Sequence, residues 1–423
     1  MGYRLCISWL KNYLLLKSLK IYGEHWRRPC FLMKSILLTL FVAFLVLPAT
    51  AGDVFVTNNL DDGSPESLRE RIVNAAADTR ICFDGSLSGK TIQLQLGELL
   101  IDENLMIDAS DLPGGIVLSG DKSGDGSSAD DSRVFLIDGS LTVTLKSLTI
   151  TGGRVPGGVR SGGGVSVTNG TNLTMEQCTV SYSQAADDGF GHGGGISSTS
   201  GSTVSLEQCT VSHTRAGDDP GVGGDGGGMH LEGSFPVVTI TDSIIAGNLP
   251  GLHTTESSHG EGADINRDDF ITAHGINLIG DNTLAIGNAS TVFQEGATVG
   301  TGANPLDALL GVLGTNGGPT ETFLPLRGSP ALNPTGGNAA SAFVNDQRGV
   351  GFPRIVLDIV DTGAVEAPDY AAIDAANAAQ AAAKAAQQAA LFKKLKKLKK
   401  KGKTPSARSR PARRRSSRSR SKS

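Results

Sequence analysis

Aromatic residues are scarce in this sequence, at 5% of its 423 residues. Both tryptophans, Trp9 and Trp26, fall within the first 32 positions, so the remaining chain has no indole ring on which a sugar could stack. Large aromatic side chains with a polar end are typical of binding surfaces. Their scarcity argues against carbohydrate processing.

Long apolar runs are missing as well. The run ILLTLFVAFLVL at positions 36–47 has 12 residues, whereas a transmembrane helix needs about 20. Basic residues precede this run and small residues follow it at positions 49–51. That order is typical of a secretory signal peptide, so we assign residues 1–51 to a leader and signal peptide. We expect translation to start at Met33, and an unusually long leader is the alternative. Membrane anchoring is the less favoured alternative.

Acidic residues are absent after Ala383. Positions 384–423 hold 17 Lys and Arg, whereas positions 35–383 hold 41 acidic residues against 14 basic ones. The Ala- and Lys-rich stretch 368–401 favours a helix. The Arg- and Ser-rich stretch 402–423 cannot bury a core, so we expect it to be disordered.

Clustered Lys and Arg bind anionic polymers because binding releases counterions. The basic tail therefore predicts attachment to an anionic envelope polymer, a polysaccharide or a membrane surface, rather than specific nucleic-acid binding. A merely solvated tail is the alternative. The residues expected to mediate attachment are Lys393, Lys394, Lys396, Lys397, Arg413, Arg414 and Arg415.

Glycine, by contrast, is abundant, and much of it lies in an internal repeat. The segments GGGVSVTNG (162–170), GGGISSTSG (193–201) and GGGMHLEG (226–233) are each followed by a second repeated unit, LTMEQCTVS (173–181), VSLEQCTVS (204–212) and VTITDSIIA (238–246). A period near 31 residues indicates stacked coils. The glycines suit tight corners that need positive φ, a simpler explanation than phosphate binding.

The phase of the apolar residues identifies the kind of coil. Val204 and Leu206 share one face of a strand, and the next inward pair, Cys209 and Val211, is displaced by one residue, as a corner at 207–208 would require. The other units behave alike, which gives three short strands per coil. The sequence therefore predicts an all-β fold, a right-handed parallel β-helix.

Cysteine usage fits this coil. Cys82, Cys178 and Cys209 remain after the leader, and an odd number argues against a disulfide framework. Cys178 and Cys209 occupy the same place in successive coils. We expect their side chains to stack inside the helix as a dry ladder of small apolar groups.

Both ends of a solenoid need a cap, because they otherwise expose strand edges and core. The stretch 65–77, with Leu68, Ile72 and Val73 on one side, should cap the N-terminal end, and the Pro- and Gly-rich stretch 316–366 should close the other. Four of its charged residues should form a structural network, namely Asp346, Arg348, Asp361 and Glu366.

The sequence predicts a chain divided into six segments. They are 1–51 (leader), 52–140 (cap and first coils), 141–300 (repeats), 301–367 (C-terminal cap), 368–401 (helix) and 402–423 (basic tail).

Several motifs resemble those of a known family. VFVTNNLDDGSPESLRERIVNA (54–75) is similar to the opening module of secreted β-helix proteins with a CSLREAI signature, although Glu66 replaces the cysteine and Arg71 the alanine. DINRDDFITAHGINLIGDN (264–282), NGGPTETFLPLRGSPALN (316–333), DQRG (346–349) and DTGAVE (361–366) resemble bacterial choice-of-anchor Q proteins. The resemblance covers about residues 53–367. It implies a secreted bacterial β-helix held at the envelope, and no reaction.

An enzyme is the alternative, because parallel β-helices include polysaccharide lyases and glycoside hydrolases. Asp187 and Asp188 precede Asp218 and Asp219 by one coil, so the two pairs should stack on one flank, with His192, His213 and Asp225 nearby. Paired carboxylates could act in catalysis, and Asp187 and Asp218 could hold Ca²⁺ weakly. We favour solvated loop acids, hence no catalytic residue, cofactor or metal.

A second calcium-like pattern is weaker. Asp264, Asn266 and Asp268 have EF-hand spacing, but an aspartate stands at the glycine position and Gly275 at that of the final acid. Taken together, the sequence predicts a monomeric, adhesin-like scaffold, secreted or held at a bacterial cell surface.

Overall fold

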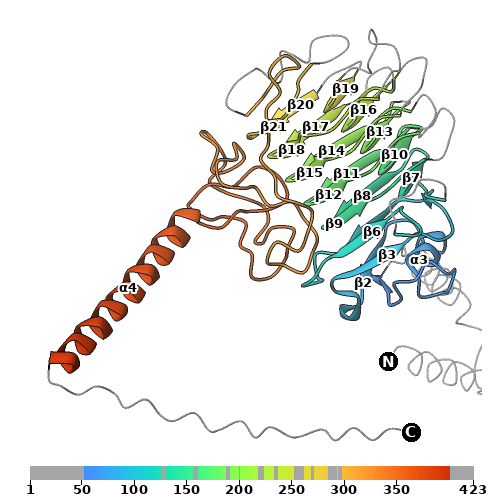
Figure 1. The fold of residues 1–423 in the computed structure, drawn as a ribbon. Coiled ribbons are helices and arrows are strands. Elements are labelled where there is room, and N and C mark those ends of the chain that lie inside the picture. The colour runs from blue at the N-terminus through green and yellow to red at the C-terminus, as the bar shows by residue number, and fades with distance from the viewer. Residues whose placement is uncertain are drawn as a thin grey trace, which may run out of the picture. The chain divides into compact units, whose positions relative to one another are not determined.

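The structure, a computed structural model, describes residues 52–124, 130–155, 161–186, 191–199, 201–217, 223–232, 237–251, 262–267, 271–283, 293 and 298–400. The expected leader 1–51 and tail 402–423 lie outside these residues. Within them, short strands wind into a solenoid of parallel sheets, so the predicted parallel β-helix is confirmed (Figure 1).

From β2 to β19 each coil contributes one strand to each of three sheets, in the order A, B, C, whereas β1 belongs to sheet A alone and the last coil has strands in sheets A and B. Sheet A contains β1 (Val54–Val56), β2 (Thr79–Phe83), β5 (Leu105–Asp108), β8 (Thr142–Lys146), β11 (Asn172–Glu176), β14 (Thr203–Glu207), β17 (Val238–Thr241) and β20 (Ile271–His274). Sheet B contains β3 (Lys90–Gln93), β6 (Ile116–Ser119), β9 (Leu148–Thr151), β12 (Thr179–Ser181), β15 (Thr210–Ser212), β18 (Ile244–Ile245) and β21 (Leu278–Ile279). Sheet C contains β4 (Leu99–Ile101), β7 (Phe135–Asp138), β10 (Val165–Thr168), β13 (Ile196–Ser198), β16 (Met229–Leu231) and β19 (Ile265–Arg267).

The strand register follows the sequence repeat. Leu173 pairs with Val204 in the next coil, and Val204 with Val238 in the coil after. Between sheets A and B the chain turns through one left-handed residue, with φ of 49° at Gln177 and 51° at Gln208. The predicted corner at 207–208 is therefore present, and it lets apolar side chains on both strands point into one core.

The glycine triplets serve two purposes. The first glycine of a triplet has the positive φ that a corner needs, 64° at Gly193. The second lies where two coils touch, since a Cβ on Gly194 would be 2.0 Å from the Arg215 carbonyl oxygen. Close approach of backbones, as well as turn geometry, thus requires glycine here.

The N-terminal cap is shorter than the sequence predicts. Helix α3 covers Leu68–Val73, with Ser67 as its N-cap, and the 3₁₀ helix η2 follows at Gly85–Leu87. Leu68 and Ile72 are buried in the core, but Val73 is 66% exposed, so its predicted place on the apolar side is wrong. One six-residue helix has too few turns to bury a third residue so near its end.

A buried ion pair fixes α3 to the first coils. Arg69 donates from Nε and Nη2 to the two carboxylate oxygens of Asp61, at 2.7 and 2.8 Å, and from Nη1 to the Glu98 carbonyl. Asp61 also accepts the N–H groups of Gln95 and Leu96. Burial opposes ionisation of Asp61, but Arg69 and these N–H groups together lower its pKa.

The C-terminal segment, residues 301–367, contacts the last coil at its start, where the Leu306 N–H donates to the Gly280 carbonyl, but much of it lies beside the solenoid and not across its end as expected. It lies along the outer face of sheet B, where the ribbon runs beside β9, β12 and β15 (Figure 1). Thr149 donates to the Glu321 carbonyl, Thr179 to the Gln347 side chain, and Thr210 accepts from the Ala364 N–H. In β9, β12 and β15 this outward position of sheet B is a threonine, whose hydroxyl needs such a partner once it is covered.

Apolar contacts complete this lateral cover. Ile244 and Leu278 of sheet B pack with Ala308 and Ala331 of the C-terminal segment in a second cluster outside the main core. Strands β12, β15 and β18 are consequently buried on both faces. Sheet B is the inner layer of the molecule, whereas sheets A and C form the other two sides of the coil.

The long helix α4, Tyr370–Lys400, follows the C-terminal segment and agrees with the predicted helix. Its start is held by Arg327, which forms an ion pair with Asp374 and stacks on the Tyr370 ring, 4.8 Å from the ring centroid. Beyond that point its described side chains are exposed, including Leu391 at 59%. Among the described residues, no helix is both long and apolar enough to cross a membrane.

Candidate functional site

The acidic pairs that the sequence offers as alternative catalytic residues lie outside the described residues. This applies to Asp187, Asp188, Asp218 and Asp219 alike, so their stacking and weak Ca²⁺ binding stay predictions. Of the residues expected beside them, His192 and Asp225 do lie together, whereas His213 lies on another side of the coil.

His192, Asp225 and His230 form a cluster beside sheet C. His192 and Asp225 each precede a glycine triplet in successive coils, and His230 is the middle residue of β16. The His192 N–H donates to Ser161 Oγ at 3.2 Å, and the Asp225 N–H donates to His192 Nδ1 at 2.9 Å. The rings of His192 and His230 stack with their centroids 4.3 Å apart. Coil stacking therefore builds the cluster.

The cluster favours neutral imidazoles. Burial lowers the pKa of His192, against the raising effect of Asp225. Burial and the neighbouring His192 lower the pKa of His230 to about 3. His230 is 7% exposed, and its Nδ1 has no hydrogen-bond partner. Neutral imidazole nitrogens and a carboxylate are together a donor set for a transition metal.

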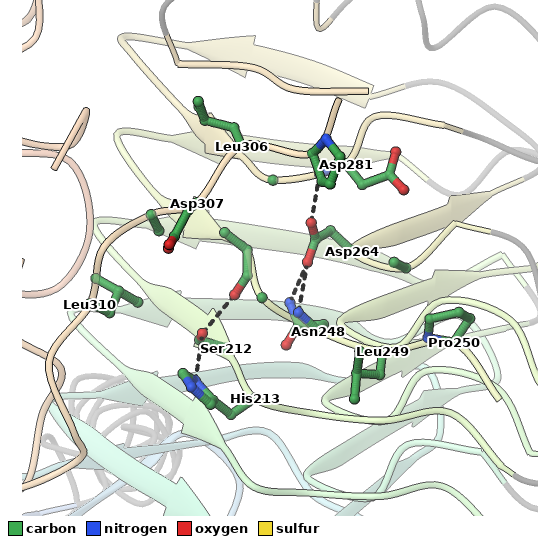
Figure 2. A pocket seen from close by; sticks show the side chains of 16 residues that line it. Ser212, His213, Asn248, Leu249, Pro250, Asp264, Asp281, Leu306, Asp307 and Leu310 are labelled. Carbon is green, nitrogen blue, oxygen red and sulfur yellow. Dashed lines mark hydrogen bonds between the residues drawn. The ribbon is translucent and has the colours of Figure 1, made fainter. Parts of the chain in front are cut away.

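A separate cavity of about 460 Å³ lies where the last coils meet residues 305–310 (Figure 2). Three aspartates line it, Asp264, Asp281 and Asp307. Asp281 accepts the Thr283 N–H and Asp307 the Leu309 N–H, each two residues further along the chain. Such bonds stabilise local turns, and they account for both carboxylates without a ligand.

Asp264 is a structural acid in this cavity wall. Its Oδ1 accepts from the backbone and side-chain N–H groups of Asn248, at 3.0 and 2.9 Å, and its Oδ2 accepts the Asp281 N–H at 2.6 Å (Figure 2). Burial raises its pKa to about 7, although these donors act in the opposite direction. With 2% exposure and both oxygens occupied, Asp264 joins two coils rather than facing a substrate.

His213 belongs to the lateral packing. Its ring stacks on Phe323 of the C-terminal segment with centroids 5.0 Å apart, and it also contacts Tyr182 one coil below. Ser212 lies within 2.9 Å of His213 Nδ1, but its hydroxyl donates to the Ala246 carbonyl and the residue is buried. Ser212 and His213 are therefore not arranged as a nucleophile and base.

The four charged residues expected to form a network in the C-terminal segment do so. Arg348 pairs with Asp346, which accepts the Glu366 N–H, and Glu366 accepts the Asp361 N–H. Burial and Asp361 raise the pKa of Glu366 to about 8. A fifth member, Arg354, was missed. It is fully buried and donates to the Asp361 and Gly363 carbonyls.

The structure places Cys178 and Cys209 inside the solenoid as free thiols. Their ladder is not a dry stack of apolar groups, however, because the Cys178 N–H donates to Cys209 Sγ at 3.4 Å. The Cys209 N–H donates to Ser243 Oγ at 3.0 Å, and the Ser243 N–H to Asn277 Oδ1 at 2.9 Å. Each side chain of the ladder thus accepts an N–H that the corner leaves without a backbone partner.

The structure describes only some of the residues that are expected to mediate attachment. Lys393, Lys394, Lys396 and Lys397 are exposed on α4. Arg413, Arg414 and Arg415 lie outside the described residues.

Comparison with known proteins supports the coil geometry. Residues 115–291 match the family model described as a right handed beta helix region. The solenoid is a right-handed parallel β-helix. No curated protein matches the chain significantly. The β-helix chain is also similar to a crystal structure of pectate lyase Pel9A, with a TM-score of 0.33 and 11% identity, over 76% of this chain and 97% of that one. Similarity at this level says nothing about activity.

Sequence reasoning missed His230 as a site residue. Its signal was available, because the equivalent outward position holds Ser166 and Ser197 in the two preceding coils. A histidine directly after two serines at this position marks a local departure from the repeat.

Proposed function

We propose that this chain is a secreted or cell-envelope-associated β-helix scaffold of the choice-of-anchor type, held to an anionic surface by its basic C-terminal part. The observation that carries the proposal is helix α4, which is fixed at its start by Arg327 and exposes Lys393, Lys394, Lys396 and Lys397 to solvent. A helix with no described packing partner along most of its length is available to bind another surface.

Charge distribution supports the same function. The 41 acidic residues of positions 35–383 should repel an anionic polymer, whereas the 17 basic residues after Ala383 should bind it. The contacts of the Ser-Leu-Arg-Glu module support the family part of the proposal, since Ser67 caps α3 and Arg69 locks it to Asp61. Neither contact depends on the cysteine that this chain lacks at position 66.

The test is binding of the full chain to vesicles of phosphatidylglycerol and phosphatidylcholine, and separately to immobilised dextran sulfate. Deleting residues 384–423 should abolish binding to both at low salt and leave the solenoid folded. Raising the salt should release the intact chain, since exposed charges are screened over about 8 Å at physiological ionic strength. Vesicle binding without dextran sulfate binding would identify a membrane surface as the partner.

A matched pair of variants separates charge from helix packing. Replacing Lys393, Lys394, Lys396 and Lys397 by Gln should weaken binding about tenfold or more, because four counterion-releasing sites are lost. The same four Lys→Arg changes keep the charge and should bind like the original chain. Attachment that survives the deletion at low salt would end this proposal and leave a solvated tail.

The second candidate is a polysaccharide lyase or glycoside hydrolase, favoured by the cavity that Asp264, Asp281 and Asp307 line. All three carboxylates accept N–H groups of the chain itself, which is the reason we rank this function lower. Product analysis on a panel of polysaccharides tests it. Activity lost in Asp281→Asn and Asp307→Asn would establish an enzyme.

A further inference from the structure

Three side chains from two successive coils converge beside sheet C. His192, Asp225 and His230 each offer one donor atom, and these atoms lie within 4.8 Å of one another. His192 Nδ1 and Asp225 Oδ2 are 3.6 Å apart. Nothing in the scaffold function requires two imidazoles and a carboxylate at this position.

His230 supplies a second, independent observation. A buried polar atom without a partner is unfavourable and rare in folded proteins. His230 is 7% exposed, yet its Nδ1 has no hydrogen-bond partner, and its ring lies against His192. A ligand at this nitrogen would satisfy it.

We propose that His192, Asp225 and His230 bind one divalent transition-metal ion, with Zn²⁺ the appropriate probe. Two nitrogens and one carboxylate oxygen suit zinc and its neighbours in the first transition row, whereas Ca²⁺ prefers oxygen ligands alone. Three protein ligands leave a coordination position for water. The ion would link the coil that contains His192 to the coil that contains Asp225 and His230.

Binding requires a local rearrangement. Ligand bonds of about 2.0 to 2.2 Å around a tetrahedral ion place the donor atoms about 3.4 Å apart, so donors that are now up to 4.8 Å apart must approach by up to about 1.4 Å. The ion also competes with the Asp225 N–H for His192, because Nδ1 is either a ligand or must carry the proton when Nε2 is the ligand. Both requirements reduce affinity, and they predict that the two rings separate when the ion binds.

The experiment uses the untagged full chain and competition between the protein and a chromophoric zinc chelator. We expect one equivalent of Zn²⁺ to bind and to raise the unfolding temperature, since the ion binds only the folded state. Co²⁺ in place of Zn²⁺ should give the visible absorption of a four-coordinate site. His230→Phe keeps the stacked ring but removes the nitrogen, and Asp225→Asn removes the charge. Each should weaken binding about tenfold or more.

His192→Gln offers a further variant, because the amide oxygen can still accept the Asp225 N–H while the imidazole is lost. The control is His213→Gln combined with His274→Gln, which changes two described histidines outside the cluster and should leave binding intact. Zinc bound equally well by His230→Phe, Asp225→Asn and His192→Gln would overturn the proposal. So would a Co²⁺ spectrum that the control variant abolishes, or no binding by the original chain.

Discussion

Replacing Cys209 by Ser should destabilise the fold less than replacing it by Ala. A dry apolar ladder would predict the reverse order, because a hydroxyl would then be buried among apolar groups. Cys209 Sγ accepts the buried Cys178 N–H and lies 3.3 Å from the Met175 carbonyl oxygen and 3.4 Å from that of Glu207, either of which can accept its one proton. Ser243 occupies the same position one coil further on. Its hydroxyl accepts the Cys209 N–H at 3.0 Å and donates to the Thr241 carbonyl at 2.8 Å. The fold thus already accommodates a serine at this corner.

The magnitudes follow from these bonds. Cys209→Ser keeps an acceptor and a donor in place, so we expect the free energy of unfolding to change by less than about 1 kcal/mol, within the net value of one hydrogen bond. Cys209→Ala leaves the Cys178 N–H buried without a partner, which costs about 1 to 3 kcal/mol. The small cavity left by the sulfur adds to that loss.

The assay is equilibrium unfolding in urea with a reductant present, comparing both midpoints and m-values, because a solenoid can unfold in parts. Cys82 is buried but lies outside the ladder, so Cys82→Ser should be no more stable than Cys82→Ala. If Cys209→Ser were as unstable as Cys209→Ala, the hydrogen bond to the Cys178 N–H would contribute nothing. The ladder would then be apolar packing after all.

Two further predictions concern the coils. Gly194→Ala should destabilise the chain by about 3 kcal/mol, because the new Cβ would lie 2.0 Å from the Arg215 carbonyl oxygen. Gly201→Ala should destabilise it by only about 1 kcal/mol, since Gly201 has φ of 74° but open space around it. Thermal unfolding of both variants checks this order. Burial raises the pKa of Asp264 to about 7, so between about pH 4 and pH 7 the folded chain retains a proton that the unfolded chain releases. The free energy of unfolding should therefore fall by up to about 1.4 kcal/mol per pH unit as the pH rises through this range. Urea titrations at pH 5 and pH 7 should differ less for Asp264→Asn than for the original chain, and equal differences would assign the pH dependence to other groups.

The repeated part of the fold could be predicted because every coil has the same pattern of inward and outward residues. Val204, Leu206, Cys209 and Val211 have equivalents in the neighbouring coils, so one phase shift at Gln208 could be checked against the others. Parallel strands with a period near 31 residues leave no freedom in register. The hydrogen bonds of the ladder could not be predicted, because an inward side chain at a corner looks the same in sequence whether it packs or accepts an N–H.

The unrepeated parts have no such internal check. Residues 316–366 were assigned to the solenoid end because an end needs covering, but Gln347 contacts Thr179, which lies 168 positions earlier in the chain. Periodicity carries no information about so distant a partner. The cluster around His230 was missed for a related reason, since it depends on one residue that breaks the repeat and on ring stacking between coils.

One signal for the lateral cover was nevertheless present in sheet B. Outward positions that face water should hold polar residues, yet the position occupied by Thr149, Thr179 and Thr210 becomes Ile244 and then Leu278 in the last coils. Apolar residues on both faces of a strand indicate a buried sheet.

The C-terminal segment that covers sheet B also changes how the solenoid should unfold. Hydrogen bonds from Thr149 to Glu321 and from Thr362 to the Ile276 carbonyl tie the C-terminal segment to coils far apart along the stack. Coils that would otherwise depend on their neighbours alone are thereby coupled through a common layer, which favours cooperative unfolding over separate loss of single coils.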